Sequence, residues 1–161
     1  ESKSWLGSGS SFSVLVEIGK ENSSDNKLEN ITNIMDLSGV KVLLVEDDID
    51  VLKSTKQLLE SWGCIVSSGR DQEEIKNVIG SDGYLLPDII VADNRLPGDA
   101  SGIDVVKLVQ KDLESLIPSV IVTGDVERGH VQSITDQGFP VLLKPIQPAK
   151  FRAILSHLIH S

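Results

Sequence analysis

The sequence predicts an α/β fold, in which a doubly wound parallel sheet carries helices on both faces. From Gly39 onward, apolar runs of strand length alternate with segments of helical periodicity roughly five times. The runs are nearly continuous in apolar residues, which is typical of parallel strands buried on both faces. Right-handed crossovers between such strands distribute the helices over the two faces of the sheet.

Each predicted strand is a short apolar run. The runs are VKVLLV (40–45), CIVSS (64–68), DIIVAD (88–93), SVIVTG (119–124) and PVLLK (140–144). Segments with apolar residues at helical spacing follow them, at 50–63, 71–80, 102–113, 125–138 and 148–159.

The helical segments carry start and stop signals. Gly63 and Gly138 stand just after predicted helices, where glycine is favoured because it adopts positive φ easily. Pro148 stands at a helix start, where its missing N–H is not needed. In the first helix, one stripe at a spacing of three and four faces the sheet: Val51, Leu52, Thr55, Leu58, Leu59 and Trp62.

The start of the chain has a different texture. Residues 1–19 predict an isolated strand, which needs partner strands to be stable. Residues 20–38 are mostly polar and predict a linker. Because the chain opens at Glu1 in the middle of an element, we expect a piece of a longer protein. The alternating apolar residues of the first strand are Phe12, Val14, Val16 and Ile18.

Composition excludes some functions. The chain of 161 residues is 40% hydrophobic, enough to bury a core. Its formal charge is −9 and its pI is near 4.7, and a surface with this negative charge repels phosphate backbones. We therefore expect no nucleic-acid binding. The single cysteine, Cys64, is predicted to be a core thiol without an internal disulfide. No apolar run approaches the ~20 residues that span a bilayer.

Polar groups follow four of the predicted strands. Carboxyl ends of parallel strands meet at one edge of a sheet, so we expect these groups to converge there. The carboxylates are suitable oxygen ligands for Mg²⁺, which would also offset their mutual repulsion. The groups are Glu46, Asp47 and Asp48 after the first strand, Asp93 at the end of the third, Thr123 at the fourth and Lys144 at the fifth.

Asp93 is the predicted phosphoryl acceptor, because a carboxylate beside a bound metal can attack phosphorus and form an acyl phosphate. Mg²⁺, Lys144 and the Thr123 hydroxyl could each hold one oxygen of the transferred group. This chemistry rests on positioning and electrostatics and needs no acid–base residue. The histidines lie on predicted helices and are predicted to be surface residues: His130, His157 and His160.

Four motifs, each at a strand end, together resemble one family. VEDD, VADNRLPG, IVTGD and LLKPI, in this order, resemble the receiver (response-regulator) domain of two-component signalling. The resemblance covers residues from about 40 to 160 and implies a flavodoxin-like fold of five parallel strands. It also implies that the domain accepts a phosphoryl group from a phosphohistidine with Mg²⁺.

The resemblance assigns roles to individual residues. Asp47 is implied to ligate Mg²⁺ directly and Glu46 partly through water, together with Asp93 and the backbone carbonyl of Arg95. Asp93 is implied to be phosphorylated. By the same resemblance Thr123 is the switch hydroxyl, and Lys144 the catalytic lysine, with a cis peptide bond before Pro145. Asp48 falls just beyond the acidic pair, and we expect it to start the following helix.

The sequence departs from the family in places. Val141 occupies the position three residues before Lys144, where receivers usually carry an aromatic residue, so the mode of switching is open. The loop from Asp93 to Gly102 is one residue longer than is common. Arg95 and Asp125 occupy positions that tune phosphoryl lifetime, and we hypothesise that they pair across the mouth of the site and slow hydrolysis.

A second resemblance concerns the first residues. GSGSSFSVLVEI is similar to the last strand of the ATP-binding domain of sensor histidine kinases. The implied organisation is a kinase remnant at 1–19, a linker at 20–38 and a receiver at 39–161. The parent would be a hybrid sensor histidine kinase, which is a phosphotransferase. The resemblance implies that this part is cytoplasmic, and it leaves open whether the parent is anchored in the inner membrane.

The implied partners are a histidine kinase core and a histidine phosphotransfer domain. Receivers usually dock through the face formed here by 125–138, 140–144 and 148–159. A different reading is a Mg²⁺-dependent aspartyl phosphatase of haloacid-dehalogenase type, but its acid two residues after the nucleophile is replaced here by Arg95. A degenerate receiver that only binds partners is a third reading, and the complete set of polar groups argues against it.

Overall fold

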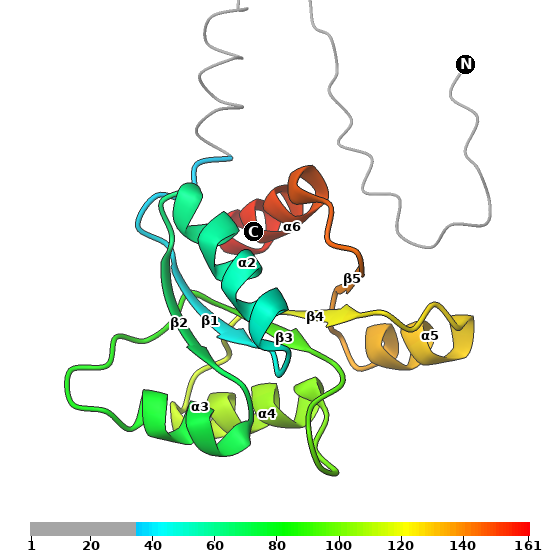
Figure 1. The fold of residues 1–161 in the computed structure, drawn as a ribbon, viewed down its shortest axis with the longest axis horizontal. Coiled ribbons are helices and arrows are strands. Elements are labelled where there is room, and N and C mark those ends of the chain that lie inside the picture. The colour runs from blue at the N-terminus through cyan, green and yellow to red at the C-terminus, as the bar shows by residue number, and fades with distance from the viewer. Residues whose placement is uncertain (1–34) are drawn as a thin grey trace, which may run out of the picture.

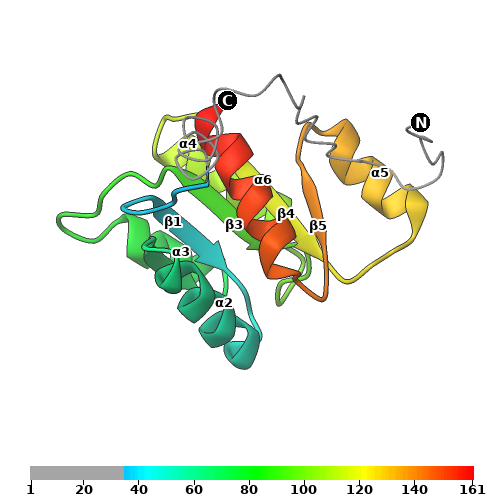
Figure 2. The ribbon, with the colours of Figure 1, turned by 90° about the horizontal axis from the view of Figure 1, so that it is seen from above.

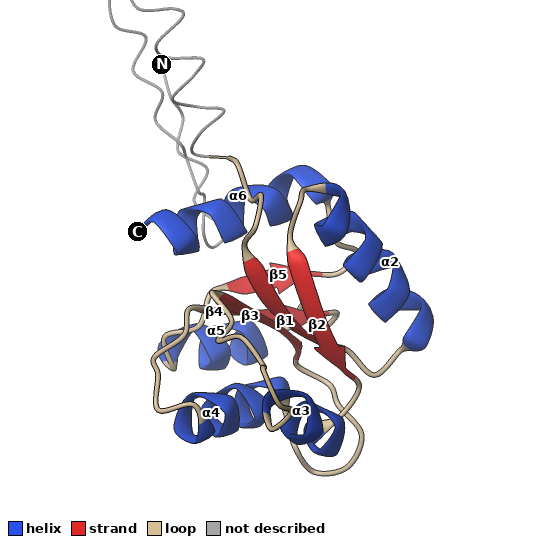
Figure 3. Ribbon diagram, turned by 90° about the vertical axis from the view of Figure 1, so that its left-hand side faces the viewer, coloured by secondary structure: helices blue, strands red, loops and turns tan. Residues whose placement is uncertain are grey.

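The structure is a computed structural model, and it describes residues 35–161 of the chain. The strand predicted within residues 1–19 and most of the linker predicted at 20–38 therefore lie outside the described residues. The described part is a three-layered domain with a sheet between two layers of helices (Figure 3).

Within the described residues, five parallel strands form one sheet in the order β2-β1-β3-β4-β5, as predicted for a flavodoxin-like fold. Helices α2 and α6 cover one face, and α3, α4 and α5 cover the other (Figures 1 and 3). The strands are β1 (Lys41–Val45), β2 (Ile65–Gly69), β3 (Ile89–Asp93), β4 (Ser119–Thr123) and β5 (Val141–Leu143). The helices are α2 (Ile49–Ser61), α3 (Gln72–Ile79), α4 (Gly102–Asp112), α5 (Arg128–Asp136) and α6 (Pro148–His160).

Two apolar clusters fill the spaces between the layers. Successive residues of a strand point to opposite faces, so β1 contributes to both clusters. Val42 and Leu44 pack toward α2 and α6, and Leu43 and Val45 pack toward α3 and α4. The near-continuous apolar strands of the sequence are therefore explained by burial on both faces.

Local signals placed most element ends correctly. Gly63 and Gly138 follow α2 and α5 with φ of 86° and 90°, and Pro148 is the first residue of α6. Helix α5 begins at Arg128, three residues after the predicted start at 125, because the Asp125 Oδ1 accepts the N–H of Glu127 and forms a turn.

The last residues of the predicted linker belong to the domain. Leu37 is fully buried, and its carbonyl oxygen lies 3.6 Å from the Sγ of Cys64, which is buried as predicted. The carbonyl oxygen of Met35 accepts a hydrogen bond from Arg152 Nε at 3.0 Å. The entering chain is thereby attached to α6.

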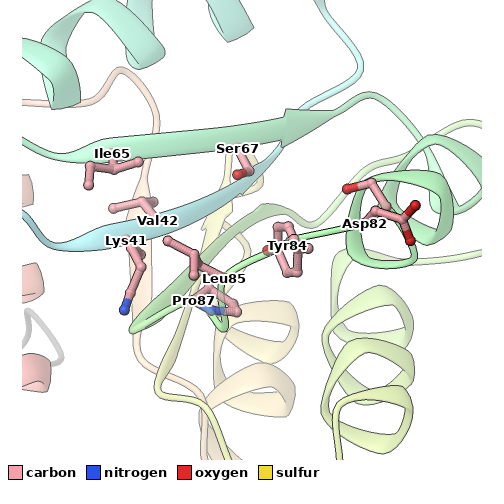
Figure 4. A pocket seen from close by; sticks show the side chains of 10 residues that line it. Lys41, Val42, Ile65, Ser67, Asp82, Tyr84, Leu85 and Pro87 are labelled. Atoms are coloured by element: carbon pink, nitrogen blue, oxygen red, sulfur yellow. The ribbon is translucent and has the colours of Figure 1, made fainter.

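A cavity of about 290 Å³ lies at the amino ends of β1 and β2, the end of the sheet opposite the predicted site (Figure 4). Tyr84 projects into this region from the segment between α3 and β3, near Ser67, Leu85 and Pro87.

None of the helices in residues 35–161 combines the length and apolar character that crossing a bilayer requires.

Candidate functional site

Three carboxylates meet where the strand order reverses. Strand β1 lies beside β3, and the chain leaves these two strands toward opposite sides of the sheet (Figure 2). Glu46 and Asp47 follow β1 directly, and Asp93 is the last residue of β3. One carboxylate oxygen from each lies within 4.8 Å of the other two. Glu46 and Asp93 are buried, whereas Asp47 is exposed to solvent.

Lys144 places one ammonium group against both buried acids. Its Nζ lies 3.0 Å from Glu46 Oε2 and 2.9 Å from Asp93 Oδ2. Lys144 follows β5, and its backbone N–H donates to the carbonyl oxygen of Thr123 at the end of β4. The sheet thereby fixes the base of the side chain beside the acids. The peptide bond between Lys144 and Pro145 is cis, as the family resemblance implies.

The electrostatics of this cluster show in two pKa shifts. Burial raises the pKa of Glu46 to about 7, and the nearby charge of Asp93 adds to the shift while Lys144 opposes it. Burial alone would lower the pKa of Lys144, but its hydrogen bonds to Asp93 and Glu46 outweigh burial and the pKa is raised. When all four groups are ionised, three carboxylates and one ammonium leave a formal charge of −2.

The donor set fits a hard divalent cation. The three side chains offer only oxygen atoms, the ligands that Mg²⁺ prefers, and a doubly positive ion would balance the remaining charge. The exposure of Asp47 leaves a route for the ion from solvent. Asp48 lies outside this group, because its Oδ1 caps α2 by accepting the N–H groups of Asp50 and Val51, as predicted.

Thr123 and Arg95 lie at the rim of the acidic group. Thr123 is buried, and its hydroxyl oxygen accepts the N–H of Asp125 at 3.1 Å. The N–H of Arg95 donates to Asp93 Oδ1 at 3.1 Å, which fixes the carboxylate of Asp93 from the side away from Lys144. The guanidinium of Arg95 lies 3.9 Å from Asp125 Oδ2, in agreement with the hypothesised pair. Its effect on hydrolysis stays a prediction.

One contact near the site was missed by the sequence analysis. Asn94 directly follows Asp93, is buried, and its side-chain Nδ2 lies 2.7 Å from His130 Nε2 on α5. His130 was predicted to be a surface residue, and it is in fact partly exposed and partly buried, with its ring against Asn94. The asparagine was visible beside Asp93, but its partner lies 36 positions along the chain.

The first turn of α4 lies so close to the backbone of Asp93 that only glycine fits at position 102 without a shift of the backbone. A Cβ atom at Gly102 would lie 2.2 Å from the Asp93 carbonyl oxygen. We expect Gly102→Ala to lower the free energy of unfolding by about 1–3 kcal/mol, because backbone would have to move. Urea denaturation measures this, with Gly129→Ala as control, since a Cβ there meets nothing within 4 Å. Equal stability of the two variants would contradict the expectation.

A second cavity opens beside Lys144. Its volume is about 580 Å³, and it lies between α2 and the segment that joins β5 to α6. The cavity is mainly apolar apart from two hydroxyls and the lysine: Val51, Ser54, Thr55, Leu58, Lys144, Pro145 and Ile146 line it. A partner surface seated there would lie next to the acidic group.

Comparisons with known proteins agree with this geometry. A family model described as "Response regulator receiver domain" matches residues 42–156. Among curated proteins, the phyllosphere-induced regulator PhyR of Methylorubrum extorquens is 26% identical over 120 residues, which are 74% of this chain and 43% of PhyR. The chain thus spans less than half the length of that relative.

Several solved structures share the fold. A CheY-like receiver domain protein from Methanospirillum hungatei is similar with a TM-score of 0.63 at 22% identity, over 76% of this chain and 95% of that one. Vibrio cholerae CheY4 gives 0.63 at 23%, over 75% and 99%. The anti-anti-sigma factor PhyR from Bartonella quintana gives 0.65 at 21%, over 84% and 55%. At these identities the likeness shows the fold alone.

Proposed function

This chain belongs to the response regulator receiver domain family, and we propose that it accepts a phosphoryl group from a phosphohistidine onto Asp93. The observation that carries the proposal is the meeting of Glu46, Asp47, Asp93 and Lys144 at the carboxyl edge of the sheet. Members of this family act with histidine kinases and phosphotransfer partners in signal transduction.

In the proposed transfer, an oxygen of the Asp93 carboxylate attacks phosphorus and forms an acyl phosphate. The bond between phosphorus and the donor's imidazole nitrogen breaks, and that nitrogen leaves with the electron pair. Lys144 is close enough to Asp93 to hold a phosphoryl oxygen once its ion pair opens. The Thr123 hydroxyl, whose oxygen already accepts the N–H of Asp125, donates its own hydrogen to another.

Glu46, Asp47, Asp93 and the carbonyl oxygen of Arg95 would hold Mg²⁺ at this site. When bound, the ion neutralises the acids and the phosphoryl oxygens, which lets two negative groups approach. The burial of Asp93 and Glu46 strengthens every charge interaction at the site, because little water screens them.

We further propose that the domain is part of a hybrid sensor histidine kinase. The sequence resemblance of residues 1–19 to the end of a kinase ATP-binding domain supports this, with a linker at 20–38 and the receiver at 39–161. The phosphohistidine donor would come from the kinase core or from a histidine phosphotransfer domain. The apolar cavity beside Lys144 supports the approach of such a partner from the side of α2.

The test is incubation of the protein with acetyl phosphate and Mg²⁺, followed by mass spectrometry of the intact chain and its peptides. We expect one phosphoryl adduct, located on the peptide that carries Asp93. Rapid release of phosphate with no adduct would instead favour the aspartyl phosphatase. A folded protein that neither forms an adduct nor releases phosphate would refute the proposal in favour of a receiver that only binds partners.

A further inference from the structure

Asn94 is held by three different elements, although it is a loop residue. Its backbone N–H donates to the carbonyl oxygen of Val122 on β4 at 2.8 Å, and its carbonyl oxygen accepts the N–H of Gly102 on α4 at 3.2 Å. Its side-chain amide donates to His130 on α5 at 2.7 Å. Asn94, which directly follows Asp93, therefore connects the backbone at the site with a helix on the outside of the sheet.

Helix α5 has few other attachments. Of its residues, all of which the structure describes, only Ile134 is buried, and Glu127 before it makes no side-chain capping bond. Gly129 in its first turn has open space around it and weakens the helix start. Beyond its end, Gln137 accepts an exposed hydrogen bond from Lys107 of α4. A helix attached in this way can shift without disrupting the core.

The chemistry of the contact makes it directional. An amide nitrogen only donates hydrogen bonds, so His130 Nε2 accepts and the imidazole carries its hydrogen on Nδ1. The amide of Asn94 is buried, so losing this acceptor would leave a buried donor unpaired. The bond thus favours one position of His130 relative to the backbone that follows Asp93.

We propose that His130 is a positioning residue, and that its hydrogen bond to Asn94 couples the phosphoryl state of Asp93 to the position of α5. The inference rests on the proposed function, because it assigns a readout to phosphorylation at Asp93. Modification of Asp93 changes the contacts of its carboxylate with Lys144 and Arg95 and so shifts the adjoining Asn94. Coupling is reciprocal, so a partner that displaces α5 alters the loop at Asp93 in turn.

The test measures amide hydrogen exchange of Arg128–Asp136 with and without beryllium fluoride plus Mg²⁺, a stable mimic of the phosphoryl group. In the wild type we expect the mimic to change exchange in α5. In His130→Ala we expect exchange of the free protein to rise roughly fivefold, as for the loss of one hydrogen bond. We expect the change caused by the mimic to disappear, while acetyl phosphate still labels Asp93. His130→Gln, which can present an acceptor, should restore part of the response.

Matched variants separate coupling from simple helix loosening. Ser133→Ala removes a polar side chain of α5 that is exposed, unlike the half-buried His130, and should behave as the wild type. Asn94→Ala should reproduce His130→Ala, and the double variant should add nothing further, because both changes remove the same bond. A response of α5 to the mimic in His130→Ala equal to that of the wild type would overturn the coupling. If acetyl phosphate did not label Asp93 even in the wild type, this result would instead refute the proposed function.

Discussion

Asp93→Asn is expected to abolish phosphoryl incorporation, with a loss of at least about 100-fold in adduct formed from acetyl phosphate. The amide oxygen of asparagine is a poor nucleophile and carries no negative charge, whereas the side chain keeps almost the same size. Asp93 is buried and contacts Lys144, as Glu46 also does, but Asp93 alone of the two is the proposed acceptor. Intact-mass spectrometry at matched Mg²⁺ measures the result.

Asp50→Asn is the matched control for this change. Asp50 lies in the first turn of α2 near the same edge of the sheet, but outside the three-carboxylate group. The substitution Asp50→Asn removes one negative charge, as Asp93→Asn does, and should leave the labelling of Asp93 unchanged. An adduct of wild-type yield in Asp93→Asn would show that another group accepts the phosphoryl and would remove Asp93 from the mechanism.

Most of the fold could be predicted because local and long-range signals agree. All five strands begin and end within one residue of the predicted runs, since short, nearly continuous apolar segments are typical of parallel strands that are buried on both faces. The last strand is shorter than predicted and runs from Val141 to Leu143. Lys144 lies just beyond the strand, although its backbone N–H still donates to the carbonyl oxygen of Thr123.

The acidic group could be predicted for a geometric reason. Parallel strands bring their carboxyl ends to one edge, so residues as far apart as Glu46 and Lys144 are fixed relative to each other by strand order alone. The ion pairs of Lys144 to both acids could not be read in this way. They depend on side-chain reach and on the balance between burial and attraction.

The contact between Asn94 and His130 lay beyond sequence reasoning for the same reason. It depends on how α5 sits over the sheet, and α5 itself starts later than its periodicity indicated. Asn and His are both common on surfaces, so neither residue type marked the pair. Val141, where the family usually carries an aromatic residue, packs against the cluster under α3 and α4.

Lys144→Met is expected to lower the free energy of unfolding by about 2 kcal/mol near pH 8, because two buried carboxylates lose their cation. Lys144 is 28% exposed at its side chain, so we expect less than for a fully buried pair. Methionine keeps the length and apolar stem of the side chain. Urea denaturation of the metal-free protein measures the loss, and Lys150→Met, an exposed lysine of α6, is the control.

The pH dependence of this loss identifies its cause. The pKa of Glu46 is raised from 4.5 to about 7, so between these values the folded state binds a proton that the unfolded state releases. The contribution of Glu46 to stability therefore falls as pH rises through this range. Lys144 opposes that shift, so its removal raises the pKa of Glu46 further and costs most above pH 7. We expect the penalty of Lys144→Met to shrink from about pH 8 to about pH 5.5.

Mg²⁺ gives an independent measure of the electrostatic role of Lys144. An ion that binds the folded state alone stabilises it by an amount that grows with its concentration. Because Lys144→Met leaves the acids without a competing ammonium, we expect Mg²⁺ to stabilise this variant more than the wild type near neutral pH. A penalty that is independent of both pH and Mg²⁺ would assign Lys144 a packing role and remove it from the electrostatics of the site.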